Sequence, residues 1–133
     1  MTTFHLQIVT PDRMAFDGQA EQIILRTVNG DVCILAHHID YATPLGIGEA
    51  RVTDDQGRTR VAACNGGLLS VHDNEVRVMA ITFDWEDDID LERARRAESA
   101  AQEQLQALAR EDQDFAVAEA KLKRAMARIR AKG

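Results

Sequence analysis

The hydrophobic pattern of this chain changes once, near residue 88, from the alternation typical of strands to the three- and four-residue steps typical of helices. Residues 4–8 alternate apolar and polar side chains, which predicts a strand with one buried face that ends at Pro11. A second short strand is expected over residues 14–16, followed by a turn at Asp17-Gly18. The chain is therefore expected to begin with strands.

Turn-forming residues separate the next apolar runs, and each separation predicts a hairpin. Asn29-Gly30 is the clearest turn, because this dipeptide suits the positive φ angles of a tight hairpin. The predicted strand pairs are 23–28 with 32–35, 49–53 with 58–64, and 68–71 with 75–81. So many short strands at close spacing favour an all-β sandwich or flattened barrel.

Apolar residues then recur at three- and four-residue steps in two segments, and each set forms a narrow apolar stripe, or seam, along a predicted helix. Asp90 suits the N-cap of a helix that should end near residues 110–114. The seam of this helix comprises Leu91, Ala94, Ala97, Ala101, Leu105 and Leu108, and a second seam comprises Phe115, Ala118, Leu122, Ala125 and Ile129. Two seams joined by a short turn predict an antiparallel α-helical hairpin. Because both seams are rich in alanine, the hairpin should be only marginally stable alone, which makes it a candidate moving part.

Length and boundaries agree with one compact domain and one dependent element. The chain has 133 residues and a mass of 14.8 kDa, too little for two large domains. We expect a β-sandwich domain over residues 1–88 and the helical hairpin over residues 89–133.

Charge divides the chain unevenly. The net charge is −6, yet the six charged residues from position 121 onward are all cations: Lys121, Lys123, Arg124, Arg128, Arg130 and Lys132. The C-terminal end of the chain is therefore basic, whereas the rest of the chain is acidic. Only 5% of residues are aromatic, which argues against a base-stacking surface, so no nucleic-acid partner is expected.

The candidate chemistry is sparse. Cys33 and Cys64 have no CxxC spacing and lie in apolar contexts, so we expect both to be buried rather than to form a disulfide or a zinc site. His37 and His38 are adjacent and should point to opposite faces, so no metal site is expected. No convergent set of catalytic groups is present, and the chain is not expected to be an enzyme on its own.

Four segments in register resemble the epsilon subunits of bacterial rotary F-type ATP synthases. These are residues 4–11, residues 30–38, the Gly-Gly of residues 65–71 and the helix start at residues 90–94. Departures occur in one loop: Cys33 stands where the family usually has Gly, Ala36-His37 where it has Pro-Gly, and Asp40 where it has Pro. This loop is near the surface that the family presents to its neighbours.

The resemblance implies a non-catalytic rotor subunit of a proton- or sodium-translocating synthase, peripheral on the cytoplasmic side of the bacterial plasma membrane. Its implied partners are the gamma subunit, the c-subunit ring and the alpha/beta catalytic head. Asp31 would face the c-ring, although a residue after Asn-Gly can equally be a turn former. His38 lies in the loop that the family presents to its neighbours. No stretch approaches the ~20 apolar residues of a membrane span, so membrane contact is expected only through the complex.

The resemblance also implies that the hairpin inhibits ATP hydrolysis. In the family it lies folded on the sandwich or extends along gamma into the head, where its basic helix meets acidic surfaces of the beta subunits. The residues that would make this contact here are Lys121, Lys123, Arg124, Arg128 and Arg130. The alternative is that these cations only favour a helix C-terminus and solubility.

A last motif concerns ATP. Residues Ile89, Asp90, Arg93 and Ala94 match the I-D-x-x-R-A motif with which some bacterial members bind ATP on the folded hairpin. Arg124 and Arg128 would be phosphate partners across the hairpin. ATP would be a regulatory ligand and not a required cofactor. The alternative is that Asp90 is an N-cap and Arg93 a surface residue.

Two rival functions stay open at this point. One is a stand-alone adaptor, whose basic hairpin docks on an unrelated acidic partner. The other is a small nucleotide sensor, which would require tight ATP binding by the isolated chain. Stable association with a gamma subunit would distinguish the rotor subunit from both.

Overall fold

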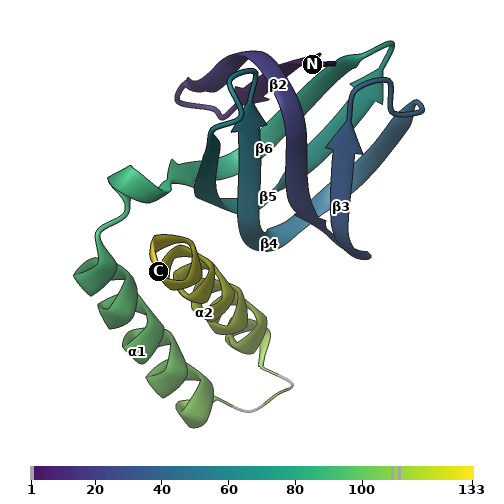
Figure 1. Cartoon of the computed structure of the whole chain (residues 1–133). Coiled ribbons are helices and arrows are strands. Elements are labelled where there is room, and N and C mark those ends of the chain that lie inside the picture. The colour runs from purple at the N-terminus through teal and green to yellow at the C-terminus, as the bar shows by residue number, and fades with distance from the viewer. Residues whose placement is uncertain (1, 109, 111) are drawn as a thin grey trace.

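The computed structural model describes residues 2–108, 110 and 112–133, and it consists of a β-sandwich followed by two helices (Figure 1). The strands are β1 (Phe4–Val9), β2 (Met14–Thr27), β3 (Gly30–Leu35), β4 (Tyr41–Asp54), β5 (Thr59–His72) and β6 (Glu75–Trp85). A short 3-10 helix η1 (Glu86–Asp88) leads into the helices α1 (Leu91–Ala107) and α2 (Gln113–Lys132). The predicted fold class, an all-β part followed by an antiparallel helical hairpin, is confirmed.

The strands close into a flattened barrel. Their order in the sheet is β1-β6-β5-β4-β2-β3, and β1 also pairs with the first half of β2. β2 changes partner at Ala20, pairing with β1 before it and with β3 and β4 after it. A β-bulge lies at this change, between Ala20 and Gln22. The barrel therefore leaves β3 as an extension along one edge of β2.

Several strands are longer than the sequence pattern predicts. The predicted turn at Asp17-Gly18 is wrong, because these residues pair with Gln7 and Leu6 of β1 inside the continuous strand β2. Residues 58–64 and 68–71 likewise belong to one strand, β5. The hairpin predicted at Asn29-Gly30 is confirmed, but its two turn residues are Val28 and Asn29, since Thr27 pairs with Gly30.

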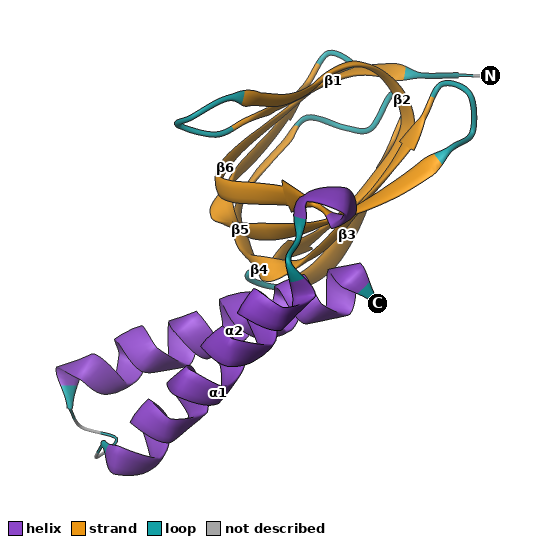
Figure 2. Ribbon diagram, turned by 90° about the vertical axis from the view of Figure 1, so that its left-hand side faces the viewer, coloured by secondary structure: helices purple, strands orange, loops and turns teal. Residues whose placement is uncertain are grey.

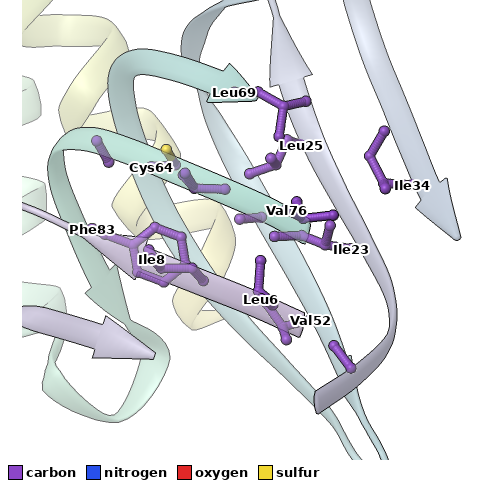
Figure 3. Close-up of a cluster of buried hydrophobic side chains, with 14 of the residues drawn as sticks. Leu6, Ile8, Ile23, Leu25, Ile34, Val52, Cys64, Leu69, Val76 and Phe83 are labelled. Carbon is purple, nitrogen blue, oxygen red and sulfur yellow. The ribbon is translucent and has the colours of Figure 1, made fainter. Parts of the chain in front are cut away.

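The core lies between the two layers of strands. Figure 3 shows Leu6 and Ile8 of β1, Ile23 and Leu25 of β2, and Leu69 of β5 converging on it. Trp85 closes one end, where its indole N–H donates to the Ala15 carbonyl at 3.1 Å. Burial in this core raises the pKa of the Cys64 thiol to about 12, so Cys64 is the buried residue that the sequence predicts. Cys33 is exposed, and its predicted burial is wrong, because its side chain lies on the outer face of β3.

The inward-facing positions shift by one residue at the same level of three neighbouring strands. In β4 the buried positions are 43 and 45, then 48, 50 and 52. In β5 the core positions are 62 and 64, then 69 and 71, and in β6 they are 76, 78 and 80, then 83 and 85. A one-residue shift exchanges the two faces of a strand. The shift falls at Gly46, Gly66 and Ile81, which lie side by side in the register of the sheet. We call this row the face switch.

Glycine permits the backbone that the face switch needs. Gly66 and Gly67 have φ angles of 64° and 122°, a region that residues with a side chain rarely adopt. A Cβ atom on Gly67 would overlap the carbonyl oxygen of Met79 on β6. The Gly-Gly pair is therefore a structural requirement of β5.

The two helices form the predicted hairpin. The Asp90 carboxylate accepts a hydrogen bond from the Arg93 backbone N–H at 3.1 Å and caps α1. Ala94, Ala101, Ala118 and Ala125 are buried, as expected for seam residues, whereas the predicted seam residue Ala97 is exposed. The turn predicted at residues 110–114 ends two residues earlier than expected, because α2 already begins at Gln113. Glu111 lies outside the described residues.

The face switch makes a prediction for Gly67→Ala. We expect it to lower the free energy of unfolding by about 2 kcal/mol more than Gly57→Ala, because the new methyl group overlaps backbone at position 67 and meets open space at position 57, and overpacking of this kind costs about 1–3 kcal/mol. Gly57 is the matched control, since its φ is 79° but no atom lies within 4 Å of a Cβ placed there. Urea unfolding followed by Trp85 fluorescence measures both variants. Equal loss in the two variants would contradict this role of Gly67.

Candidate functional site

Helix α2 lies on the outer face of the sandwich and forms the contact that joins the two parts. In Figure 1, α2 lies between α1 and the strands, and Figure 2 shows the hairpin projecting beyond one end of the barrel. Ala127 and Ala131 of α2 are buried against Ala63 of β5 and Ile89. Ile47 and Val61 pack around this cluster. Each buried alanine methyl contributes only about 1 kcal/mol, so the apolar part of this contact is weak.

Polar contacts support the same junction. The Arg128 side chain donates from Nε to Asp84 Oδ2 at 3.0 Å, and each side chain is about one-third exposed (32% and 34%). Lys132 Nζ donates to the Glu86 carbonyl at 3.2 Å. The basic end of α2 is thus held by the end of β6 and by the short 3-10 helix that follows it. We call the Arg128–Asp84 pair the latch.

Three other cations of α2 face solvent. Lys121, Lys123 and Arg130 are exposed, and Lys123 lies 3.9 Å from Glu119 one turn away on the same helix. Arg124 is half-buried. The five cations predicted to bind a partner are therefore divided in the folded state. Arg128 forms an ion pair with the sandwich, and the other four predicted cations form no ion pair with the described residues of the sandwich.

The residues of the predicted ATP motif come together in one cleft. Asp90, Arg93, Ala94 and Arg128 line a cleft of about 430 Å³ at the start of α1, together with the buried residue Ile89. Arg124 does not line it. It lies instead on a neighbouring groove between α1 and α2, which Arg128 also lines.

The charges of this cleft are mixed. Its lining includes the carboxylates of Asp84, Asp88 and Asp90 and the guanidinium groups of Arg93 and Arg128. Asp84 already binds Arg128, and Asp90 caps α1. A phosphate group in this cleft would gain two arginines but would also lie near three carboxylates, which limits the attraction.

Asp31 and His38 lie at opposite ends of β3. Figure 1 shows β3 running from its turn with β2 at the lower edge of the sandwich to a loop at the upper edge. Asp31 is the second residue of β3, and its carboxylate pairs with Arg26 Nε at 2.8 Å. His38 follows the end of the strand, and Leu35, the last residue of β3, lies about 13 Å from Asp31 at ~3.3 Å per residue. The structure therefore does not bring these two predicted contact residues into one site.

Hydrogen bonds fix the loop that contains His38. The His37 N–H donates to Asn74 Oδ1 at 2.7 Å, and Asp40 Oδ2 pairs with His72 Nδ1 at 2.9 Å. The hydrogen bond with His72 lowers the pKa of Asp40, and the same bond raises the pKa of His72. Asp40 thus ties the loop to the turn between β5 and β6.

One surface was not predicted from the sequence. Exposed or half-buried apolar side chains occupy directly paired positions from β2 through β1, β6, β5 and β4 to the β2–β3 turn. We call this row the apolar belt, and its members are Met14, Val9, Met79, Leu68, Pro44 and Val28. The relative exposures of Leu68 and Met79 are 51% and 42%. The unbroken apolar run of residues 78–81 could have indicated it, since such runs occur where both faces of a strand are covered.

Contiguous exposed apolar surface on a folded protein indicates a binding surface. The apolar belt crosses five strands and so offers a partner a broad, rigid face. No helix among the described residues is both long and apolar enough to cross a lipid bilayer.

Comparison with known protein families identifies the family of this chain. The family described as "ATP synthase, Delta/Epsilon chain, beta-sandwich domain" matches residues 3–86, and the family described as "ATP synthase, Delta/Epsilon chain, long alpha-helix domain" matches residues 87–133. The chain belongs to the ATP synthase delta/epsilon family. Membership makes it a non-catalytic subunit of ATP synthase.

Curated relatives agree over almost the whole length. An ATP synthase epsilon chain from Halalkalibacterium halodurans is 36% identical over 130 residues, which cover 97% of this chain and 96% of the relative. An ATP synthase epsilon chain from Ruminococcus albus is 38% identical with the same coverage.

Solved structures share the fold. A chain from the Euglena gracilis mitochondrial ATP synthase (OSCP/F1/c-ring) matches with a TM-score of 0.81 at 21% identity, covering 92% of this chain and 77% of that one. A chain from the Tetrahymena thermophila mitochondrial ATP synthase (central stalk/c-ring) matches with a TM-score of 0.57 at 17% identity, covering 96% and 92%. At these identities the likeness concerns the fold.

The latch predicts how the hairpin of this epsilon-family chain is released. Asp84→Asn should accelerate amide hydrogen exchange in α2 about fivefold, because a partly exposed ion pair contributes about 1 kcal/mol and the detached hairpin is marginally stable. Asp87→Asn is the matched control, since Asp87 is exposed and forms no ion pair with another described residue. Hydrogen exchange followed by mass spectrometry measures both. Equal exchange in the two variants would show that the latch does not hold α2.

Proposed function

We propose that this chain is the epsilon subunit of a bacterial F-type ATP synthase and turns with the central stalk. In this role its sandwich binds the gamma subunit and the c-subunit ring and transmits rotation toward the alpha/beta catalytic head. The family membership and the bacterial relatives support this role, and so does a location on the cytoplasmic face of the plasma membrane, reached through the complex. The observation that carries the proposal is the apolar belt.

The apolar belt is suited to a permanent partner. Its members come from neighbouring strands that pair in register, so they move as one rigid body and do not need to be ordered on binding. Apolar area of this kind is typical of the core of lasting interfaces. We assign the belt to the gamma contact, because a subunit that transmits rotation must not slip on its neighbour.

Asp31 and His38 belong to different contacts in this proposal. Their places at opposite ends of β3 allow one end of the sandwich to face the c-ring while the other faces a different neighbour. We assign Asp31 to the c-ring, because its pair with Arg26 is exposed and such pairs exchange partners at little cost. His38 is assigned to the contact at the other end.

The hairpin is proposed to inhibit ATP hydrolysis when it leaves the sandwich. The weak alanine contact and the single latch support this, since few interactions must break before α2 can detach. Detachment would add Arg128 and Lys132 to the exposed cations Lys121, Lys123 and Arg130. The full basic face of α2 would then be available to acidic surfaces of the alpha/beta head.

A regulatory ATP in the cleft at the start of α1 is a second part of the proposal. Arg93 and Arg128 come from α1 and from α2, so an anion between them would favour the folded hairpin by its differential affinity. The nearby carboxylates of Asp84, Asp88 and Asp90 favour weak binding. When bound, ATP would supply charge that bridges the two helices and no chemical reaction.

The gamma assignment makes a prediction for Leu68→Ser. It should weaken binding of the full chain to the cognate complex that lacks this subunit by about 10-fold or more, because a half-exposed leucine in an interface contributes about 1–2 kcal/mol. Leu35→Ser is the matched control: Leu35 is 52% exposed against 51% for Leu68, and it lies on β3 outside the belt. Biolayer interferometry measures both. Similar affinities of the two variants would refute the assignment, and a wild-type chain that did not bind would favour the stand-alone adaptor.

The ATP proposal makes a prediction for Arg93→Ala. Isothermal titration should detect ATP binding to the isolated wild-type chain, and Arg93→Ala should weaken it about 10-fold, the effect of losing one charge-assisted contact. Arg95→Ala on the same helix is the control, since Arg95 does not line the cleft. No detectable binding at millimolar ATP would exclude the regulatory site.

A further inference from the structure

The exposed apolar surface continues from the apolar belt toward α2. Ile81 lies two residues beyond Met79 on β6, and its side chain is 61% exposed. It belongs to the face switch, whose other two members are glycines. Its side chain lies over Gly66 of β5: a Cβ placed on Gly66 would be 3.2 Å from Ile81 Cδ1. Beyond Ile81 the surface continues as a groove toward α2.

The groove has one wall from the sandwich and one from the hairpin. It measures about 640 Å³, and Ile47 and Ile81 supply apolar surface from the strands. Met126 and Ala127 face them from α2. Met126 is 39% exposed, so a flexible apolar side chain is available at the hairpin side. The groove exists only while the hairpin is folded, because detachment of α2 removes one wall.

The charges of the groove are all positive. Arg26, Lys123 and Arg130 line it, and no carboxylate does so among the described residues. Arg26 pairs with Asp31 and Lys123 lies near Glu119, but both pairs are exposed and contribute little. An anionic partner can replace either carboxylate without leaving a buried charge.

We propose that the folded hairpin completes the docking surface of the sandwich. An apolar segment of the stalk partner that carries acidic side chains lies along the apolar belt, crosses Ile81 and enters the groove against α2. The inference rests on the proposed gamma contact and adds to it a partner chemistry and a consequence. Because part of the surface belongs to α2, the partner binds the folded form more tightly, and its binding holds the hairpin down.

Charge reversal tests the proposal in the full chain. Lys123→Glu combined with Arg130→Glu should weaken binding to the cognate complex lacking this subunit about 10-fold at low salt, and the difference should shrink as salt is raised. Arg95→Glu combined with Arg96→Glu is the matched control with the same change of charge on the hairpin, since both residues are exposed on α1 and neither lines the groove. Circular dichroism verifies that both variants keep their helices.

A second measurement follows the hairpin itself. Binding of the complex should slow hydrogen exchange of α2 amides several-fold in the wild-type chain and less in the Lys123→Glu, Arg130→Glu variant. Exchange that is unchanged or accelerated on binding would overturn the proposal, as would equal affinities of the two charge-reversal variants. Concentration-dependent dimers of the free chain that Ile81→Ser abolishes would also overturn it, by assigning the groove to a second copy.

The outcome is separable from that of the gamma assignment. If Leu68→Ser weakens binding but charge reversal at positions 123 and 130 does not, the belt binds the partner and the groove does not. If Leu68→Ser has no effect, the belt assignment itself fails.

Discussion

The face switch at Gly46, Gly66 and Ile81 is the constraint on which the rest of the structure depends. A strand has two faces, and a shift by one residue exchanges them. Because three neighbouring strands shift at the same level, each contributes to the core on both sides of the switch while its outer face changes character. On one side the outer face carries the apolar belt, and on the other it carries the residues beneath α2, among them Ile47, Val61 and Ala63.

The hairpin is held by interactions that are individually weak. Alanine contacts, one partly exposed ion pair and a lysine on a backbone carbonyl join α2 to the sandwich. None of these needs more than about 1–2 kcal/mol to break, so the folded and detached forms can be close in free energy. A ligand or partner that distinguishes them by a similar amount can therefore shift the balance. Arg128 pairs with Asp84 in the folded form, and in the detached form it would be free to bind a partner.

Local chemistry made part of this structure predictable. Asn29-Gly30 and Asp90 act through their immediate backbone, so the turn and the helix cap follow from the sequence. Strand lengths did not follow, because Gly66-Gly67 has the composition of a turn but lies inside β5, where only neighbouring strands reveal its role. Alanines behave similarly: Ala97 and Ala127 look alike in a helical pattern, and tertiary packing alone decides that Ala127 is buried. The apolar belt depends on register between distant strands, which a single sequence does not disclose.

The central claim is that a weakly held basic hairpin limits ATP hydrolysis, and hydrolysis by the cognate catalytic complex tests it most directly. The account predicts that the full chain inhibits, that Asp84→Asn inhibits more strongly because α2 is released, and that alanine at Lys121, Lys123 and Arg130 inhibits less because the head loses its basic partner. Asp87→Asn should behave as wild type. Equal inhibition by all four chains, or none by any, would contradict the account.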